Sequence, residues 1–188
     1  KAAVAISERN FVYITALPRT RELRKVTAAM NNLSAKIQEV IGQEFNRAEQ
    51  LRKEAFEDPL TGALNRRGFE QAVGARLDDR SEVYAGALAF ACLSGVEEIN
   101  ALLGLARGDE IVKRLSTVLA TPGDHGAAIV GRWQGPTLAA FIPNIAKQTA
   151  LDWADDLCRS FSSAIREAGL PSGVLLSMSL AHFSESRV

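Results

Sequence analysis

The sequence VGRWQGPTLAAFIP, residues Val130–Pro143, decides the fold that the rest of the chain must complete. Two apolar runs, Ala127–Trp133 and Leu138–Ile142, stand on either side of Gln134–Thr137, which contains a Gly-Pro pair. Apolar runs that flank a Gly-Pro turn are typical of a β-hairpin. We therefore expect a hairpin at the centre of a sheet, with its short polar turn at the end of the sheet, where a ligand can approach the backbone.

The composition restricts the classes of function. The chain has 188 residues, of which 47% are hydrophobic and 23% charged, as expected for one folded domain with an appendage. Its formal net charge is +0, so no nucleic-acid partner is expected. Cys92 and Cys158 form no Cys-x-x-Cys motif, and no apolar run is long enough to span a membrane. We expect a cytoplasmic fragment without direct membrane contact, whose parent protein is anchored in the inner membrane upstream of Lys1.

One long helix is predicted ahead of the hairpin domain. Thr20 suits an N-cap, and the apolar residues after it repeat at spacings of three and four as far as Ile37, which is a heptad pattern. Beyond Ile37, two successive steps of four indicate a stutter. Arg21–Glu57 therefore reads as one helix, which needs a partner because it has no core of its own. A parallel homodimer is the simplest partner, and packing along its own domain is the alternative. The expected dimer residues are Leu23, Val26, Met30, Leu33, Ile37, Ile41 and Phe45.

The segment DPLTGALNRRGF, residues Asp58–Phe69, ends this helix, because proline disfavours helix in the preceding residue and Gly62 permits a turn. It resembles the Asp-x-Leu-Thr-Gly-x-x-Asn-Arg-Arg opening of GGDEF domains, the diguanylate cyclases that join two GTP molecules into cyclic di-GMP. The hairpin also resembles the signature hairpin of this family, in which an Arg–aromatic pair, here Arg132–Trp133, precedes Gly-Gly-Asp-Glu-Phe. We interpret the opening segment as a structural turn, in which Asp58, Asn65 and the two following arginines bond loop backbone.

The remaining elements complete an α+β fold. They are a helix from Arg67 to about Leu77, a strand at Tyr84–Ser94, two helices separated by a Gly104–Gly108 loop, a helix at Lys147–Ala168 and a strand at Val174–Phe183. The order βααββαβ predicts a nucleotide-cyclase or palm-like domain, with a central antiparallel sheet flanked by helices, after the long N-terminal helix.

A second resemblance concerns the long helix. ELRKVTAAMNNL, residues Glu22–Leu33, is similar to the second helix of HAMP relay modules, with Asn10–Arg21 as the connector and Lys1–Glu8 as the end of the first helix. The two resemblances imply a partial HAMP module at 1–38, a signalling helix at 39–57 and a GGDEF domain without its C-terminal helix at 58–188. This order is similar to that of LapD-like receptors, which implies an EAL domain in the full-length chain.

The residues that carry the chemistry of GGDEF cyclases are replaced in this chain. Joining two nucleoside triphosphates needs a divalent metal, which carboxylates hold. The resemblance puts Cys92 at the family's metal-binding Asp, Ser94 at the second acidic position of that strand, and Glu97 at a Lys that meets phosphate. The five signature positions are Gln134, Gly135, Pro136, Thr137 and Leu138. We therefore expect a degenerate site without a metal, a cofactor or catalysis.

Two residues suggest a remnant of the guanine pocket. Asn100 and Asp109 occupy the positions that contact guanine in the family, and an Asp can accept hydrogen bonds from guanine N1 and N2. The alternative for Asp109 is an N-cap of a helix Glu110–Leu119, with Gly108 in the turn.

Three other positions are expected to carry no ligand. The family's Arg-x-x-Asp feedback site falls on His125 and Ala128, which lack both charges, so cyclic di-GMP is not expected there. Trp133 is expected to pack rather than to stack on a base. Cys92 lies within an apolar strand and is interpreted as an inert core thiol.

These observations favour a catalytically inactive GGDEF signalling module, which relays conformational change between HAMP and an output domain in cyclic di-GMP signalling. A GTP-binding regulatory GGDEF domain, a cyclase with residual activity and a plain dimerisation scaffold are the alternatives.

Overall fold

The computed structural model describes residues 20–78, 85–120, 128–169 and 173–184. The chain divides into two compact units, one that ends at Arg52 and one that begins at Lys53. The expected HAMP connector and first helix fall almost entirely on residues 1–19, which lie outside the described residues.

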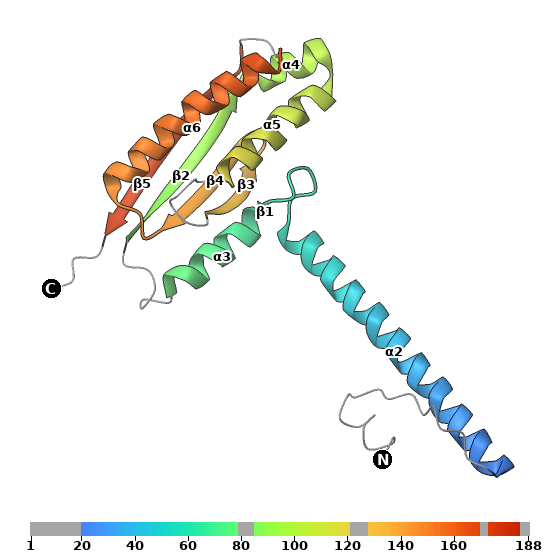
Figure 1. Ribbon diagram of the computed structural model, residues 1–188. Coiled ribbons are helices and arrows are strands. Elements are labelled where there is room, and N and C mark those ends of the chain that lie inside the picture. Colours follow the sequence, from blue (N-terminus) through green and yellow to red (C-terminus); the bar gives the residue numbers. More distant parts are fainter. Residues whose placement is uncertain (1–19, 79–84, 121–127, 170–172, 185–188) are drawn as a thin grey trace. The chain divides into compact units, whose positions relative to one another are not determined.

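Helix α2 is a single uninterrupted helix at Arg21–Phe56, as the heptad pattern predicts (Figure 1). The amide of Arg24 donates to the carbonyl of Thr20 at 3.1 Å, which closes the first turn. Five of its seven expected dimer residues are exposed to solvent in the described structure, with 49–69% of the surface accessible at Leu23, Val26, Leu33, Ile41 and Phe45. The other two, Met30 and Ile37, are half-buried. No helix in the described part of the chain is both long and apolar enough to cross a membrane.

The second unit contains a five-stranded sheet in the order β1-β3-β4-β2-β5. The strands are β1 (Leu64–Asn65), β2 (Ala85–Ser94), β3 (Ile129–Gln134), β4 (Thr137–Pro143) and β5 (Leu175–Ser184). The predicted hairpin is confirmed as β3 and β4, and β2 pairs antiparallel with both β4 and β5. The sheet is mixed because β1 pairs with β3 in parallel. The sequence did not predict β1, since two residues are too few to show a strand period.

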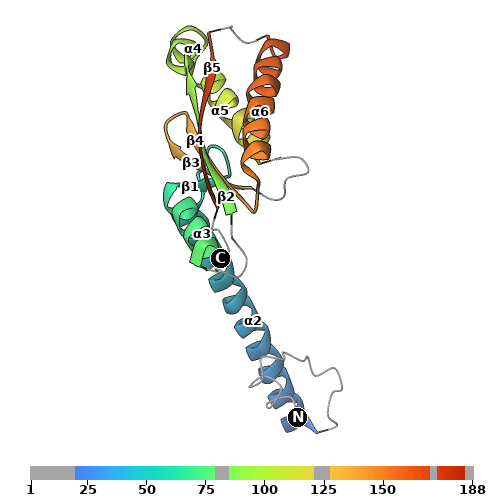
Figure 2. The same cartoon turned by 90° about the vertical axis from the view of Figure 1, so that its left-hand side faces the viewer.

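Helices cover both faces of this sheet. They are α3 (Arg66–Asp78), α4 (Val96–Leu103), α5 (Leu105–Leu119) and α6 (Lys147–Glu167). Figure 2 shows α5 and α6 on one side of the sheet and α3 on the other. The alanines of β2, Ala87, Ala89 and Ala91, are buried on the α5–α6 side, where small side chains allow the helices to pack closely. Phe69 of α3 packs with Phe141 of β4 on the opposite side.

The prediction of a loop at Gly104–Gly108 is wrong. Only Gly104, with φ 89°, separates α4 from α5, and Gly108 lies buried inside α5. A Cβ at Gly108 would lie 2.0 Å from Asn100 Oδ1, so this glycine permits close packing of α5 on α4 and makes no turn. The alternative interpretation of Asp109 as an N-cap is therefore also wrong, because Gly104 occupies that position.

Candidate functional site

The hairpin turn and the end of β2 lie together at one end of the sheet. The antiparallel register places Cys92 opposite Thr137, and the Thr137 hydroxyl donates to Cys92 Sγ at 3.4 Å. The amide of Leu93 donates to the carbonyl of Pro136 at 3.3 Å. The structure therefore brings together two of the positions at which the family resemblance expects carboxylates.

The interpretation of Cys92 as a core thiol is wrong, because its side chain is exposed. Side chains alternate along a strand, so Cys92 points away from the face on which Ala91 and Leu93 are buried. The prediction failed because residues 84–94 form a continuous apolar run, in which no alternation of polar and apolar residues shows which side chains are exposed.

The other replaced positions differ in their exposure and contacts. Leu138 is fully buried in the core, whereas Gln134 is exposed beside a register shift between Arg132 and Gln134. Ser94 Oγ donates to the carbonyl of Leu175 at 3.3 Å, and Glu97 is exposed in the first turn of α4. Across the ranges that the structure describes, no three His, Cys, Asp or Glu side chains are grouped as metal ligands.

Asn100 has a buried polar atom without a partner. Its Oδ1 accepts no hydrogen bond from any described residue and lies against Gly108 of α5. Leaving a buried acceptor unpaired costs on the order of 1–3 kcal/mol, so such an atom needs an explanation. Asp109 follows Gly108 in the sequence, but its side chain is exposed, and no hydrogen bond joins it to Asn100 among the described contacts.

The opening turn is joined to the hairpin by one arginine. Asp58 Oδ1 accepts hydrogen bonds from the amide and the hydroxyl of Thr61, both at 2.9 Å. Arg132 Nη1 lies 3.2 Å from Asp58 Oδ2, and Arg132 Nε donates to the carbonyl of Gly135 at 2.8 Å. Burial raises the pKa of Asp58, but the bonds from Thr61 and the charge of Arg132 outweigh it, so the pKa lies below its ordinary 3.8. The Arg132 side chain thus holds the opening turn against the hairpin turn, a role that the sequence did not predict.

Asn65 bonds to backbone groups, as predicted for the opening segment. Its Nδ2 donates to the carbonyl of Ala55 at 2.9 Å, and its Oδ1 accepts from the amide of Gly68 at 2.9 Å. The side chain therefore links the end of α2 to the start of α3.

The two arginines after Asn65 contact aromatic rings, whereas loop backbone was predicted as their partner. Arg66 lies over the ring of Trp133 at 4.3 Å, and Arg67 lies over the ring of Phe56 at 5.4 Å. Trp133 packs edge-on against Phe90, with ring centroids 5.1 Å apart, so the expectation that it packs is confirmed.

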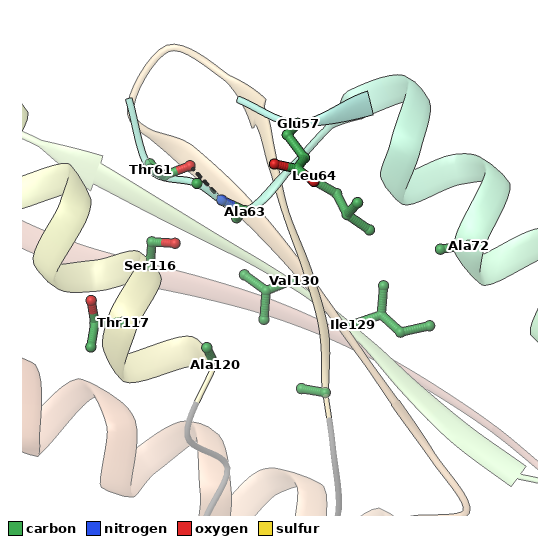
Figure 3. Close-up of a pocket in the computed structure, with 12 residues that line it drawn as sticks. Glu57, Thr61, Ala63, Leu64, Ala72, Ser116, Thr117, Ala120, Ile129 and Val130 are labelled. Carbon is green, nitrogen blue, oxygen red and sulfur yellow. Dashed lines mark hydrogen bonds between the residues drawn. The ribbon is translucent and has the colours of Figure 1, made fainter. Parts of the chain in front are cut away.

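A pocket of about 630 Å³ lies between the opening turn, α5 and β3, and its described lining includes neither Cys92 nor Thr137 (Figure 3). Glu57 and the hydroxyls of Thr61, Ser116 and Thr117 are its polar side chains, and Val130 forms part of its apolar wall. Its described lining holds no basic residue to neutralise a phosphate. Ala128, the second position of the feedback site, lines this pocket, and His125, the first, is outside the described residues.

The chain belongs to the GGDEF family, because the family described as "Diguanylate cyclase, GGDEF domain" matches residues 55–186. It is 38% identical over 118 residues to an uncharacterised protein of the hutH 5′ region in Streptomyces griseus, covering 60% of this chain and 47% of that protein. It is 29% identical over 135 residues to the diguanylate cyclase DgcM of Escherichia coli K12, covering 71% of this chain and 32% of DgcM. The chain thus spans less than half the length of these curated relatives.

Solved structures share the fold of a long helix followed by a GGDEF domain. The coiled coil and GGDEF domain of DgcB from Caulobacter crescentus, in complex with cyclic di-GMP, superposes with a TM-score of 0.67 at 18% identity, covering 85% of this chain and 83% of that one. The S helix-GGDEF-EAL protein LapD of Vibrio cholerae superposes with a TM-score of 0.61 at 19% identity, covering 78% of this chain and 33% of LapD.

Proposed function

We propose that this chain is a catalytically inactive GGDEF module, which relays conformational change between a HAMP module and an output domain in cyclic di-GMP signalling. The observation that carries the proposal is the pair formed by Cys92 and Thr137. These two residues meet where the family resemblance places the carboxylates that hold the metal. A thiol and a hydroxyl are poor ligands for Mg²⁺, which prefers carboxylate oxygens.

The replacement of a lysine by Glu97 supports the same proposal. Glu97 stands at the position of a phosphate-binding Lys, so a triphosphate would meet a negative charge there. Removing one preorganised electrostatic contact from an enzyme lowers its rate on the order of 10²–10³. With the metal-binding and phosphate-binding positions all replaced, only the positioning of the two GTP molecules would remain to accelerate the reaction.

A synthesis assay tests the proposal. We expect no cyclic di-GMP above a protein-free blank when the chain is incubated with GTP and either Mg²⁺ or Mn²⁺, with the product measured by chromatography. DgcM, assayed in parallel, is the positive control. Product that increases in proportion to the concentration of this chain would refute the proposed inactivity.

The relay part of the proposal rests on the exposed residues of α2. Apolar side chains at Leu23, Val26 and Phe45 are more than half accessible in the described structure. A helix with such a face gains stability by burying it against a partner helix. We propose that this partner is a second copy of the chain in a parallel homodimer. By analogy with the order S helix-GGDEF-EAL in the solved LapD protein, we propose an EAL domain as the output in the full-length chain.

A second candidate function is GTP binding without turnover, and the unpaired Asn100 Oδ1 favours it. This oxygen could accept a hydrogen bond from the N–H groups of a guanine base, which would satisfy a buried acceptor. We expect calorimetry with GTP to show weak binding that is unchanged by Mg²⁺. Asn100→Ala should abolish this binding, whereas Glu98→Gln on the same helix should preserve it. An absence of binding heat in the parent chain would eliminate this candidate.

A further inference from the structure

Strand β5 forms a long edge of the sheet, and no described strand pairs with its outer side. All ten of its residues pair in continuous register with β2, and no other described strand pairs with it (Figure 1). About half of the backbone N–H and C=O groups of an edge strand point outward and remain available to another strand. The opposite edge of the sheet is formed by β1, which has only two residues.

The sequence of β5 lacks the usual protection of an edge. LLSMSLAHFS, residues Leu175–Ser184, contains no charged residue, no proline and no glycine, and its register with β2 shows no bulge. Proteins commonly use such features to prevent pairing at exposed edges. The accessible side chain of Leu175, 64% exposed, adds apolar surface to the strand. The described strand is therefore open to the addition of another strand.

A groove of about 450 Å³ runs between this strand and helix α6. Its lining includes Met178 and Leu180 of β5 and Leu151 of α6, and no residue of β2, so the groove lies on the side of β5 away from β2. The charged residues of its described lining are Asp152 and Asp155, and both are acidic. The groove therefore combines an apolar floor with negative charge.

The partners of the two aspartates leave this charge available. Asp152 accepts a hydrogen bond from the neutral amide of Gln148 at 3.0 Å, and no cation pairs with Asp155 among the described residues. The thiol of Cys158 lies in the same groove. Burial first, and then the negative charge of Asp155, raise the pKa of this thiol above its ordinary value.

We propose that β5 and the groove beside it bind an extended segment of a partner protein that carries Lys or Arg at every second position. The backbone of the segment adds to the sheet as a sixth strand and pairs with the outer side of β5. Its basic side chains lie on the α6 side, where their aliphatic stems cover Leu151, Met178 and Leu180. Their charged ends reach Asp152 and Asp155. Its alternate residues lie beside Ser177 and Ser179, which are exposed and small.

A second copy of the chain is a poorer occupant of this edge. Two copies joined antiparallel through β5 would place both α6 helices on the same face of a continuous sheet, so that two pairs of Asp152 and Asp155 would approach each other. Like charges at such a contact are unfavourable. Strand β5 contains no Lys or Arg to compensate them, and its His182 is hydrogen-bonded to the carbonyl of Ile145.

A peptide titration tests the proposal on the whole 188-residue chain. The probe is a capped octapeptide of alternating valine and lysine with a fluorescent label, and binding is followed by anisotropy. Two control peptides isolate the two parts of the contact: one has glutamate in place of each lysine, and one has methylated backbone nitrogens at alternate residues. The variant is Asp152→Asn with Asp155→Asn. Asp156→Asn is the matched control, because Asp156 lies on the same helix outside the groove and pairs with Arg159.

We expect the valine–lysine peptide to bind the parent chain and the Asp156→Asn control equally, and the double variant about tenfold more weakly, since exposed charge pairs are individually weak. The glutamate and methylated peptides should not bind. The proposal is overturned if the methylated peptide binds the parent chain as well as the unmodified valine–lysine peptide does. It is also overturned if the parent chain binds neither of these two peptides. It is also overturned if the peptide dissociates a dimer that persists without the α2 contacts, because a second copy would then be the occupant.

Discussion

Cys92 and Thr137 lie on neighbouring strands with their side chains in contact, so a double replacement, Cys92→Asp with Thr137→Glu, would return two acidic groups to the end of the sheet. We expect this variant to remain inactive with GTP and Mg²⁺ in the chromatographic assay. Pro136 restricts the turn and has no backbone N–H to donate, and Glu97 still repels the phosphates. Circular dichroism checks that the variant is folded. Sustained production of cyclic di-GMP by this variant would show that the pocket needs only the two carboxylates.

Asp58 makes a pH-dependent contribution to stability. At neutral pH, Asp58→Asn should lower the free energy of unfolding by about 1–2 kcal/mol, because it weakens the charge-assisted hydrogen bonds from Thr61 and Arg132. The side chains of Asp58 and Arg132 are only 14% and 24% exposed, so solvent screens their interaction little. The pKa of Asp58 is lowered on folding, so its contribution is fully present above the ordinary value of 3.8 and is lost as pH falls through the folded-state pKa. Urea unfolding of both proteins over a pH series measures this difference.

The matched control is Asp156→Asn, which removes an ion pair whose side chains are 70–75% exposed. We expect a change within about 0.5 kcal/mol for this control, as is usual for surface pairs. A stability difference between the parent and Asp58→Asn that stays constant as pH falls below 3.8 would contradict the proposed origin of the effect.

At the scale of an element, helix α3 offers two glycines with opposite expectations. A Cβ at Gly68 would lie 2.3 Å from the backbone oxygen of Phe56, whereas a Cβ at Gly74 meets nothing within 4 Å. Gly68→Ala should therefore destabilise the domain by about 1–3 kcal/mol, because backbone must move to admit the methyl group. Gly74→Ala should stabilise it by about 0.5–1 kcal/mol, since alanine favours helix more than glycine does.

Thermal unfolding followed by circular dichroism measures both glycine variants. Equal effects of the two substitutions would show that helix propensity alone decides them. It would also show that the close approach of Gly68 to the end of α2 has no energetic weight.

At the scale of the whole molecule, the exposed residues of α2 predict the state of assembly. Leu33→Glu with Ile37→Glu should convert a dimer into monomers, because like charges would be buried against each other at the helix contact. The GGDEF domain should stay folded, since it forms a compact unit of its own. Multi-angle light scattering measures the mass, and near-ultraviolet circular dichroism reports the domain.

The control for this experiment is Asn32→Glu with Gln38→Glu, which adds the same charges at exposed positions outside the predicted contact. This control should remain dimeric. A parent chain that is monomeric at high concentration, or a Leu33→Glu, Ile37→Glu variant that remains dimeric, would mean that α2 packs elsewhere.

The sequence alone determined the features that depend on neighbouring residues. The apolar repeat predicted α2 to within a residue at its end, and the Gly135–Pro136 turn between apolar runs predicted the hairpin of β3 and β4. Helix periodicity and turn chemistry act over a few residues, so they can be read without knowledge of the fold. The match of Asp58–Phe69 to the GGDEF opening likewise needed only the order of residues.

The tertiary structure decided what depends on contacts between distant residues. The exposure of Cys92, the link from Asp58 through Arg132 to Gly135, and the unpaired oxygen of Asn100 each arise from packing between separate elements. Gly108 was assigned to a turn because glycine favours turns, but its small size serves the contact of α5 with α4. Local patterns report backbone preference, whereas burial and pairing are set by the elements that the fold brings together.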